Sequence, residues 1–232
     1  MNIHRFLLGL SLFDFLSGMV AILCMYAFTS CDDHAPVDDG IHPGYLLLSD
    51  HSMVSEETYS SFPDASRSPV IGVVFATATA SHPSLAVMLN EFEGKYCDTL
   101  VSCGASTNDT LFNGRANTIS MMEAKVDSVA DICPLAVLAQ RSHNDGQSDF
   151  IPSVAEMRLL SSASHVVNPV ISRHGGTPVC VDPAGDCWYW TSTESASSQK
   201  LFSWLCSAVN GGILETVKTE RHKARVIVEL NY

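Results

Sequence analysis

The stretch CWYWTSTESASSQKLFSWLC, residues 187–206, sets two short aromatic-rich runs on either side of a polar segment. Each run has the length and composition of a β-strand. Side chains alternate between the two faces of a strand, so Trp188 and Trp190 share one face and Tyr189 lies on the other. The polar connection 194–200 then joins two strands, and its side chains are free to face solvent.

The chain after this stretch continues in strands. LFSWLCSAV is followed by Asn-Gly-Gly at 210–212 and then by ILETV, and Asn-Gly between two apolar runs is a strong hairpin signal. Phe202 and Trp204 share one face of the first of these strands, and we expect both to be packed. RVIVEL at 225–230 alternates in the same way, so it predicts a closing strand whose single buried face is formed by Val226, Val228 and Leu230.

Two helices are predicted before the opening stretch. Between Asn117 and Gln140, apolar residues recur every three or four positions, as one buried helical face requires, and Pro134 should kink or split the helix. A second helix begins at Ser153, because Glu156 three residues later completes a capping-box sequence, and it should run to about residue 164. The recurring apolar residues of the first helix are Ile119, Met122, Val126, Val129 and Cys133.

The region before the helices is predicted to form strands. Apolar, partly β-branched runs bounded by Pro, Ser and Gly lie near 44–49, 70–78 and 84–89. Strands, then two helices, then more strands indicate an α+β domain. We expect a mixed, mainly antiparallel sheet with two main helices and long loops, spanning 44–232.

The N-terminal segment predicts export. A single basic residue precedes an apolar run that reaches Phe28, and the following Thr-Ser-Cys resembles the lipobox of bacterial lipoproteins. We therefore interpret 1–30 as a signal peptide, Cys31 as the lipidated residue and 31–43 as an acidic tether. An uncleaved helical anchor is the alternative. The acidic residues after Cys31 resemble the signal that places lipoproteins on the outward face of the outer membrane.

Charge and cysteine content narrow the possible partners. The formal net charge of -12 predicts a surface that repels nucleic acid.

An exported chain meets an oxidising compartment, and six cysteines outside the N-terminal segment allow 15 complete pairings, which sequence does not rank. The shortest loops would be closed by Cys97 with Cys103 and by Cys180 with Cys187, while buried free thiols are an equal competitor. The remaining two are Cys133 and Cys206.

A family resemblance enters through five motifs in order. GRANT, DFIPSVAEMRLL, WYWTSTE, NGG and RVIVEL resemble the C-terminal half of exported bacterial domains with a C-type-lectin-like fold. This is the variant shared with formylglycine-generating enzyme and with the variable proteins of diversity-generating retroelements. Phe150 and Ile151 replace the usual Trp and Leu but keep apolar bulk. The resemblance implies that Trp190 is in the core, that one helix opens at Gly114, Asn117 and Thr118, and that the other opens at Pro152, Ser153 and Glu156.

The chain carries no recognisable catalytic or metal-binding motif. The histidines are scattered singly, without HxxxH or CxxC spacing, and there is no Gly-x-Ser-x-Gly. The closely spaced copper-binding cysteines of formylglycine-generating enzymes are not reproduced by Cys180 and Cys187. We therefore expect no enzyme activity, no metal and no cofactor.

Binding without chemistry is the leading hypothesis. It describes a lipid-anchored surface protein that binds a protein or glycan on a host or neighbouring cell, with residues 188–222 as a diversified face in its narrower version. The rival hypothesis is a structural subunit of a pilus-like or cell-envelope assembly. An exposed aromatic site would favour glycan binding, and an unpaired strand edge would favour assembly. The candidate ligand-binding residues are Tyr189, Glu194, Ser195, Ser197, Ser198, Gln199 and Lys200.

Overall fold

A computed structural model describes residues 40–141 and 148–230 of the chain. The predicted signal peptide, the predicted lipidation site Cys31 and residues 31–39 of the predicted tether lie outside these residues. The described residues from Ile41 onward form one compact unit. Among the described residues, no helix is both long enough and apolar enough to cross a bilayer.

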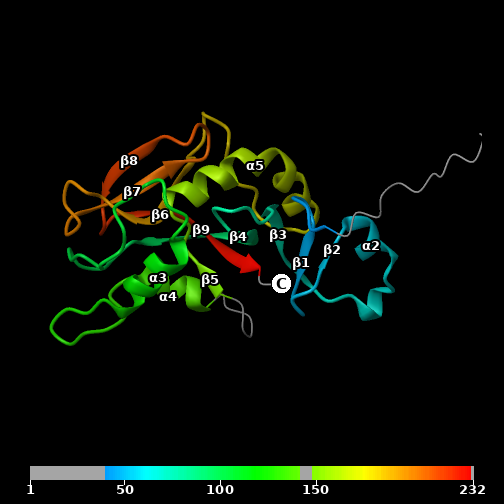
Figure 1. The fold of residues 1–232 in the computed structure, drawn as a ribbon, viewed down its shortest axis with the longest axis horizontal. Helices are drawn as coiled ribbons and strands as arrows, with labels where there is room; N and C mark the ends of the chain where they lie inside the picture. Colours follow the sequence, from blue (N-terminus) through cyan, green and yellow to red (C-terminus); the bar gives the residue numbers. More distant parts are fainter. Residues whose placement is uncertain (1–39, 142–147, 231–232) are drawn as a thin grey trace, which may run out of the picture. The chain divides into compact units, whose positions relative to one another are not determined.

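The described part of the chain contains one mixed, nine-stranded sheet, which confirms the predicted α+β class (Figure 1). The strand order is β2-β1-β3-β4-β9-β6-β7-β8, with β5 also paired to β9. Neighbouring strands are antiparallel except β6 and β9, which are parallel. The strands are β1 (Leu46–Leu48), β2 (Met53–Val54), β3 (Val70–Ala76), β4 (Ser84–Lys95), β5 (Ser148–Phe150), β6 (Trp188–Glu194), β7 (Phe202–Ser207), β8 (Ile213–Val217) and β9 (Arg221–Leu230).

The closing strand β9 lies at the centre of the sheet and is buried on both faces. Its side chains from Ala224 to Val228 are all buried, including the charged Arg225. The prediction of a single buried face is therefore wrong. Both faces of β9 are buried because the strand pairs with β4, β5 and β6 inside the sheet and helices cover the sheet on both sides.

The helices lie on opposite faces of the sheet. Figure 1 shows α5 on one side and α3 with α4 on the other. One core cluster packs α5 against Tyr189 and Ile227, and a second packs α3 and α4 against Trp190 and Val226. The helices are α2 (Glu56–Ser61), α3 (Gly114–Glu123), α4 (Pro134–Arg141) and α5 (Val154–Arg173), with a short 3-10 turn at Asp64–Ser66.

The predicted helix between 117 and 140 is two shorter helices joined by a loop. Pro134 does not kink a continuous helix but is the first residue of α4, a position where its missing N–H costs nothing. Two members of the predicted apolar face, Ile119 and Val129, are 47% and 60% exposed. The buried face of α3 is instead formed by the small or polar residues Gly114, Asn117 and Thr118 together with Met121.

Helix α5 begins as predicted and ends later. Ser153 accepts a hydrogen bond from the backbone N–H of Glu156, and the Glu156 carboxylate accepts one from the backbone N–H of Ser153. The same carboxylate accepts the backbone N–H of Gly114, so it joins the first turns of α3 and α5. The helix continues through Pro169 to Arg173, beyond the predicted end near 164.

The predicted Asn-Gly hairpin is confirmed. Strands β7 and β8 pair in antiparallel register around Asn210, Gly211 and Gly212. Gly211 has φ +70°, a conformation that residues with a Cβ seldom adopt. Its carbonyl also accepts a hydrogen bond from Arg158 of α5, so the turn is attached to the helix.

We predict that Gly114→Ala destabilises the domain by about 2–3 kcal/mol, as over-packing in a closed site does. A Cβ at this position would lie 2.2 Å from Glu156 Oε2 and 2.7 Å from the Ile151 carbonyl oxygen. Gly94→Ala is the matched control, because its Cβ would make an ordinary contact at 3.5 Å to Leu138. Urea unfolding followed by circular dichroism measures both. Equal stability of the two variants would contradict the role given to Gly114.

Candidate functional site

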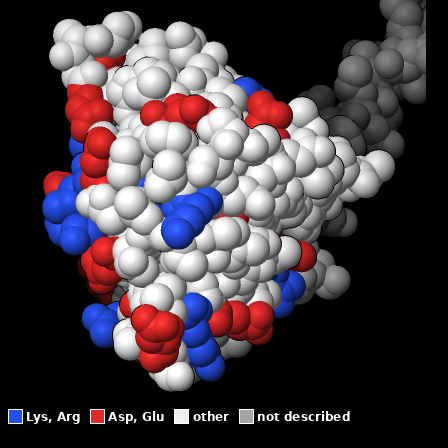
Figure 2. Space-filling view, turned by 90° about the vertical axis from the view of Figure 1, so that its left-hand side faces the viewer, with Lys and Arg blue, Asp and Glu red and all other residues white. Residues whose placement is uncertain are grey.

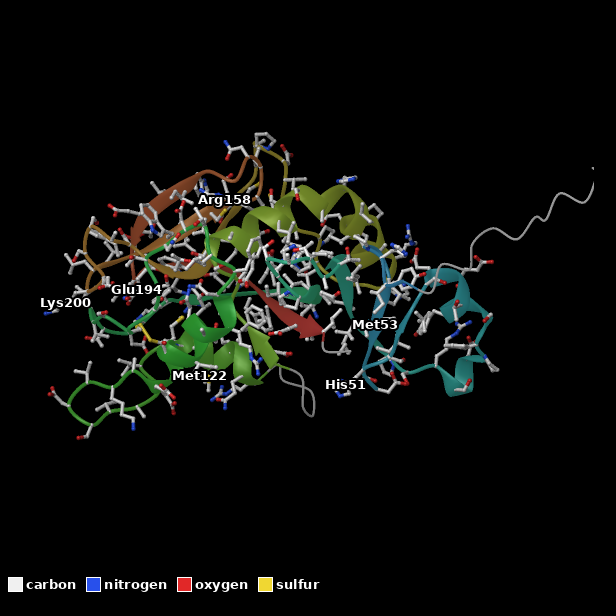
Figure 3. All side chains as sticks on the ribbon, viewed as in Figure 1. His51, Met53, Met122, Arg158, Glu194 and Lys200 are labelled. Carbon is white, nitrogen blue, oxygen red and sulfur yellow. A yellow bond between two sulfur atoms is a disulfide. The ribbon has the colours of Figure 1, made fainter. Side chains whose placement is uncertain are left out.

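The candidate ligand-binding residues separate into a buried group and an exposed group. Tyr189, Glu194 and Ser195 are 0% exposed. The others lie on the β6–β7 loop, where Ser197, Gln199 and Lys200 are exposed and Ser198 is half-buried. In Figure 3, Lys200 lies at the outer edge of the molecule, whereas Glu194 lies farther in. The predicted display of Tyr189, Glu194 and Ser195 is therefore wrong.

Tyr189 is a buried hydrogen-bonding residue of the core. Its ring packs in the α5 cluster. Its hydroxyl donates to Glu91 Oε2 at 3.2 Å and accepts the backbone N–H of Cys180 at 2.8 Å. Arg225, which is fully buried, donates to the same Glu91 oxygen at 3.5 Å and to the carbonyl of Thr177. Alternation placed Tyr189 on the face opposite Trp190, but α5 covers that face too.

The tryptophans of the opening stretch are scaffold. Trp190 is fully buried, as predicted, and its Nε1 donates to the carbonyl of Gly94 at 3.1 Å. Trp188, Phe202 and Trp204 are half-buried. The aromatic run therefore presents no open platform of stacked rings.

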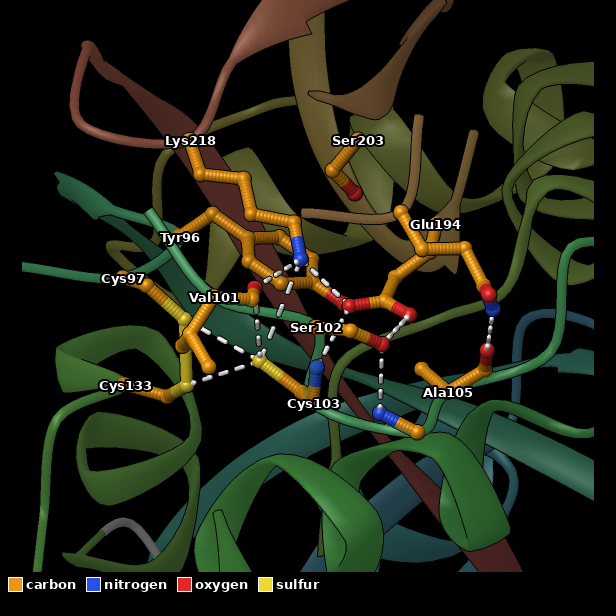
Figure 4. A network of polar contacts seen from close by, with 12 residues as sticks. Tyr96, Cys97, Val101, Ser102, Cys103, Ala105, Cys133, Glu194, Ser203 and Lys218 are labelled. Atoms are coloured by element: carbon orange, nitrogen blue, oxygen red, sulfur yellow. Dashed lines mark hydrogen bonds and ion pairs between the residues drawn. A yellow bond between two sulfur atoms is a disulfide. The ribbon is translucent and has the colours of Figure 1, made fainter. Parts of the chain in front are cut away.

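Glu194 forms a buried ion pair with Lys218, which the sequence analysis did not identify (Figure 4). Both side chains are 0% exposed. Glu194 also accepts the backbone N–H of Cys103 at 2.7 Å and the hydroxyl of Ser102 at 3.2 Å. Lys218 Nζ donates to the carbonyl of Val101 at 2.8 Å. Lys218 stands in the mixed-sign segment 218–225, whose composition resembles a solvated turn, so no sequence signal marks its burial.

The exposed loop is fixed at its base. The hydroxyls of Ser195 and Ser197 both donate to the Glu215 carboxylate of β8, and these bonds lower the pKa of Glu215. The Gln199 side-chain amide donates to the carbonyl of Ala105 at 3.4 Å. Polar side chains thus hold the loop against β8 and against the segment that follows Cys103.

Three cysteine sulfurs meet beneath this region. Cys97 and Cys133 form a disulfide, and Cys103 Sγ lies 3.2 Å and 3.3 Å from their sulfurs. The predicted pairing of Cys97 with Cys103 is therefore not the one found. Burial raises the pKa of the Cys103 thiol to about 12. In a reduced chain, the three convergent thiols would be a donor set that soft metal ions prefer. The sequence has no CxxC spacing that would indicate such a set.

Cys180, Cys187 and Cys206, the other cysteines among the described residues, are free thiols. Cys206 is buried among apolar side chains of the α5 cluster, and this burial raises its pKa to about 11. Cys187 is buried and within hydrogen-bonding reach of Cys180, so the pair expected from loop length is adjacent but not bonded. Burial raises the pKa of Cys187 to about 12.

Charged groups of both signs share the surface near this loop. Figure 2 shows blue and red side chains interspersed on the face that lies at the left of Figure 1. In the described part of the chain, Arg221 forms an ion pair with Glu93, and Arg158 forms one with Asp109. This face carries no uniform basic area of the kind that binds nucleic acid.

Comparisons with known proteins identify a likeness of fold. A fimbrial protein from Bacteroides ovatus, known from a crystal structure, superposes on 82% of this chain with a TM-score of 0.60 and 16% sequence identity. The chain spans about half of that protein, 49% of its length. No protein-family model matches the chain, and no curated protein matches it.

We predict that Tyr189→Phe destabilises the domain by about 1–3 kcal/mol, because a buried donor or acceptor loses its partner. The variant leaves the Cys180 N–H and Glu91 Oε2 without the hydroxyl that joins them. Tyr59→Phe is the control, since the Tyr59 hydroxyl makes one part-buried bond to the Ser68 carbonyl and should cost less. Chemical denaturation measures both. A Tyr189→Phe protein as stable as the parent would show that the hydroxyl is not structural.

Proposed function

We propose that the chain is a non-catalytic subunit of a fimbria-like cell-surface assembly, exported and anchored through Cys31. The observation that carries this proposal is the likeness of 82% of the chain to a fimbrial protein. The edge of the sheet supplies the physical support.

The sheet offers an open edge for assembly. Strand β8 ends the strand order and, among the described residues, pairs with β7 alone. Leu214 on this strand is 49% exposed, and its neighbour Glu215 is exposed as well. An exposed edge strand is a template for a strand from another chain. Burial of the aromatic run argues in the same direction, since an assembly subunit does not need an aromatic platform.

We also propose that the domain is a C-type-lectin-like variant. The pairing of β4 with the closing strand β9, with α3 and α5 between them in sequence, supports this assignment. The motif residues support it too, because Gly114 and Asn117 lie in the first turn of α3 and Ser153 caps α5.

We predict that Leu214→Lys lowers incorporation of the full-length chain into surface assemblies by about tenfold, a difference of about 1.4 kcal/mol. A lysine on an edge strand opposes strand addition. Leu111→Lys is the matched control, because Leu111 is 47% exposed but lies in a loop. The measurement is the amount of each variant in high-mass surface material from cells that carry the gene. Equal incorporation of both variants, or a chain recovered only as a monomer, would contradict the assembly role.

A second candidate function is recognition of a protein or glycan by the β6–β7 loop. The supporting observation is that Ser197, Gln199 and Lys200 are exposed while Glu215 holds the base of the loop. A loop fixed in this way loses less conformational entropy when it binds.

We predict that changing these three residues together to alanine abolishes any glycan binding of the mature chain on an array. The reason is that Lys200 supplies an exposed hydrogen-bonding group, while Ser197 and Gln199 are exposed and also hold the loop through Glu215 and Ala105. The control is Thr79→Ala combined with Ser81→Ala, two exposed residues of the β3–β4 turn. Absence of binding by the parent, or binding retained by the triple variant, would remove the glycan-binding role of this loop.

A further inference from the structure

The contact between Glu194 and Lys218 joins an amine and a carboxyl group inside the protein. Glu194 is the last residue of β6, and Lys218 directly follows β8. Neither side chain has any exposed surface. Removing two opposite charges from water is costly, and their attraction often fails to recover that cost. The pair therefore gains if it can be replaced by a neutral group with the same hydrogen bonds.

The surroundings of the Glu194 carboxyl group favour attack on its carbon. The backbone N–H of Cys103 donates to Oε1 at 2.7 Å, and the hydroxyl of Ser102 donates to Oε2 at 3.2 Å. A fixed N–H of this kind stabilises the oxyanion that forms when a nucleophile adds to a carbonyl carbon. Ser102 is exposed, so Oε2 is the carboxylate oxygen whose hydrogen-bond partner reaches the surface.

The amine is equally constrained. Lys218 Nζ donates to the Val101 carbonyl at 2.8 Å and lies 4.9 Å from the centre of the Tyr96 ring. These contacts hold the nitrogen beside the carboxyl group in the folded chain (Figure 4). The folded chain thus holds the two groups together at a much higher effective concentration than free amines and carboxylates have in solution, which speeds their condensation.

We propose that Lys218 and Glu194 condense to an intramolecular amide bond after the chain has folded. The Nζ–Cδ bond forms and the Cδ–Oε2 bond breaks. Two of the three ammonium protons leave the nitrogen and depart with Oε2 as water. The ammonium and the carboxylate become one neutral amide, whose oxygen, Oε1, keeps the Cys103 N–H bond. No oxidant or further reactant is required.

The chain contains its own comparison pair. Lys223 Nζ lies 3.6 Å from Glu91 Oε1, but these side chains are 28% and 20% exposed. Water solvates both charges, so the ion pair has no comparable reason to condense. This pair stays ionic in the same molecules in which residues 194 and 218 are linked.

The bond would close the C-terminal part of the sheet. It joins the end of β6 to the end of β8 and so encloses the exposed loop and the β7–β8 hairpin in a covalent ring. A cross-link of this kind stabilises the folded state mainly because it lowers the conformational entropy of the unfolded chain. The bond does not depend on the proposed assembly function and is tested separately.

The test is the intact mass of the purified full-length exported chain after complete reduction and alkylation. Reduction opens every disulfide, so any mass deficit that remains has another cause. We expect a mass lower by one water molecule than that of the Lys218→Arg variant, after correction for the substitution. Digestion should release a branched peptide that links the segments around 194 and 218, while peptides around 91 and 223 stay separate.

The controls make each outcome decisive. Lys218→Arg keeps the positive charge but cannot form the amide, because a guanidinium stays protonated. If this variant does not fold, the mass and the peptide map of the parent chain decide alone. A parent chain with its full mass overturns the proposal, and so does a water loss mapped to any other pair of residues.

Discussion

Strand β9 is held between β4 and β6, and the cover on both of its faces determines where the rest of the chain can lie. Val226 packs toward α3 and α4, whereas Ile227 packs toward α5. The strand comes last in the sequence, yet it is central in the sheet. The whole segment between the end of β4 and the start of β9 therefore connects two strands that pair with each other. The fold cannot be completed until the last residues have been placed, so its contacts are mainly long-range.

Polar groups inside this frame connect segments that are distant in sequence. Glu156 joins the first turns of α3 and α5, Arg225 joins β9 to Glu91 and Thr177, and Glu194 joins β6 to Lys218. A buried charge without a partner is costly, so each of these groups permits one arrangement of its neighbours.

Short sequence patterns correctly predicted the elements that are determined by residues close together in the chain. Ser153 and Glu156 lie three residues apart, and a capping box is a property of that spacing, so the start of α5 was correct. Asn210 and Gly211 likewise determine a turn by their own conformational preferences. Pro134 also indicated a break in the helical pattern. The break is a loop that separates two helices, and Pro134 begins the second of them.

Elements decided by distant neighbours were not predictable in this way. The alternation of apolar and polar residues along β9 predicts a strand with one buried face. It carries no information about the second layer of helix that covers the other face. For the same reason Tyr189 was assigned to solvent, and Lys218 was overlooked. The pairing of Cys97 with Cys133 depends on the place where α4 meets the end of β4, and loop length alone favoured Cys103.

Burial also restricts where the C-terminal region can vary. If residues 188–222 form a diversified face, the positions within it are not equivalent. Trp190, Glu194 and Lys218 fill or bond inside the core, so changing one of them alters the scaffold rather than the surface. Diversity compatible with this fold is confined to exposed positions, which lie in the loop after Ser195, around the hairpin turn at Asn210, at Leu214 and Glu215 on β8, and at Glu220 and Arg221. The buried ion pair keeps the ends of β6 and β8 in place, whereas Ser197 and Gln199 also hold the loop through their bonds to Glu215 and Ala105.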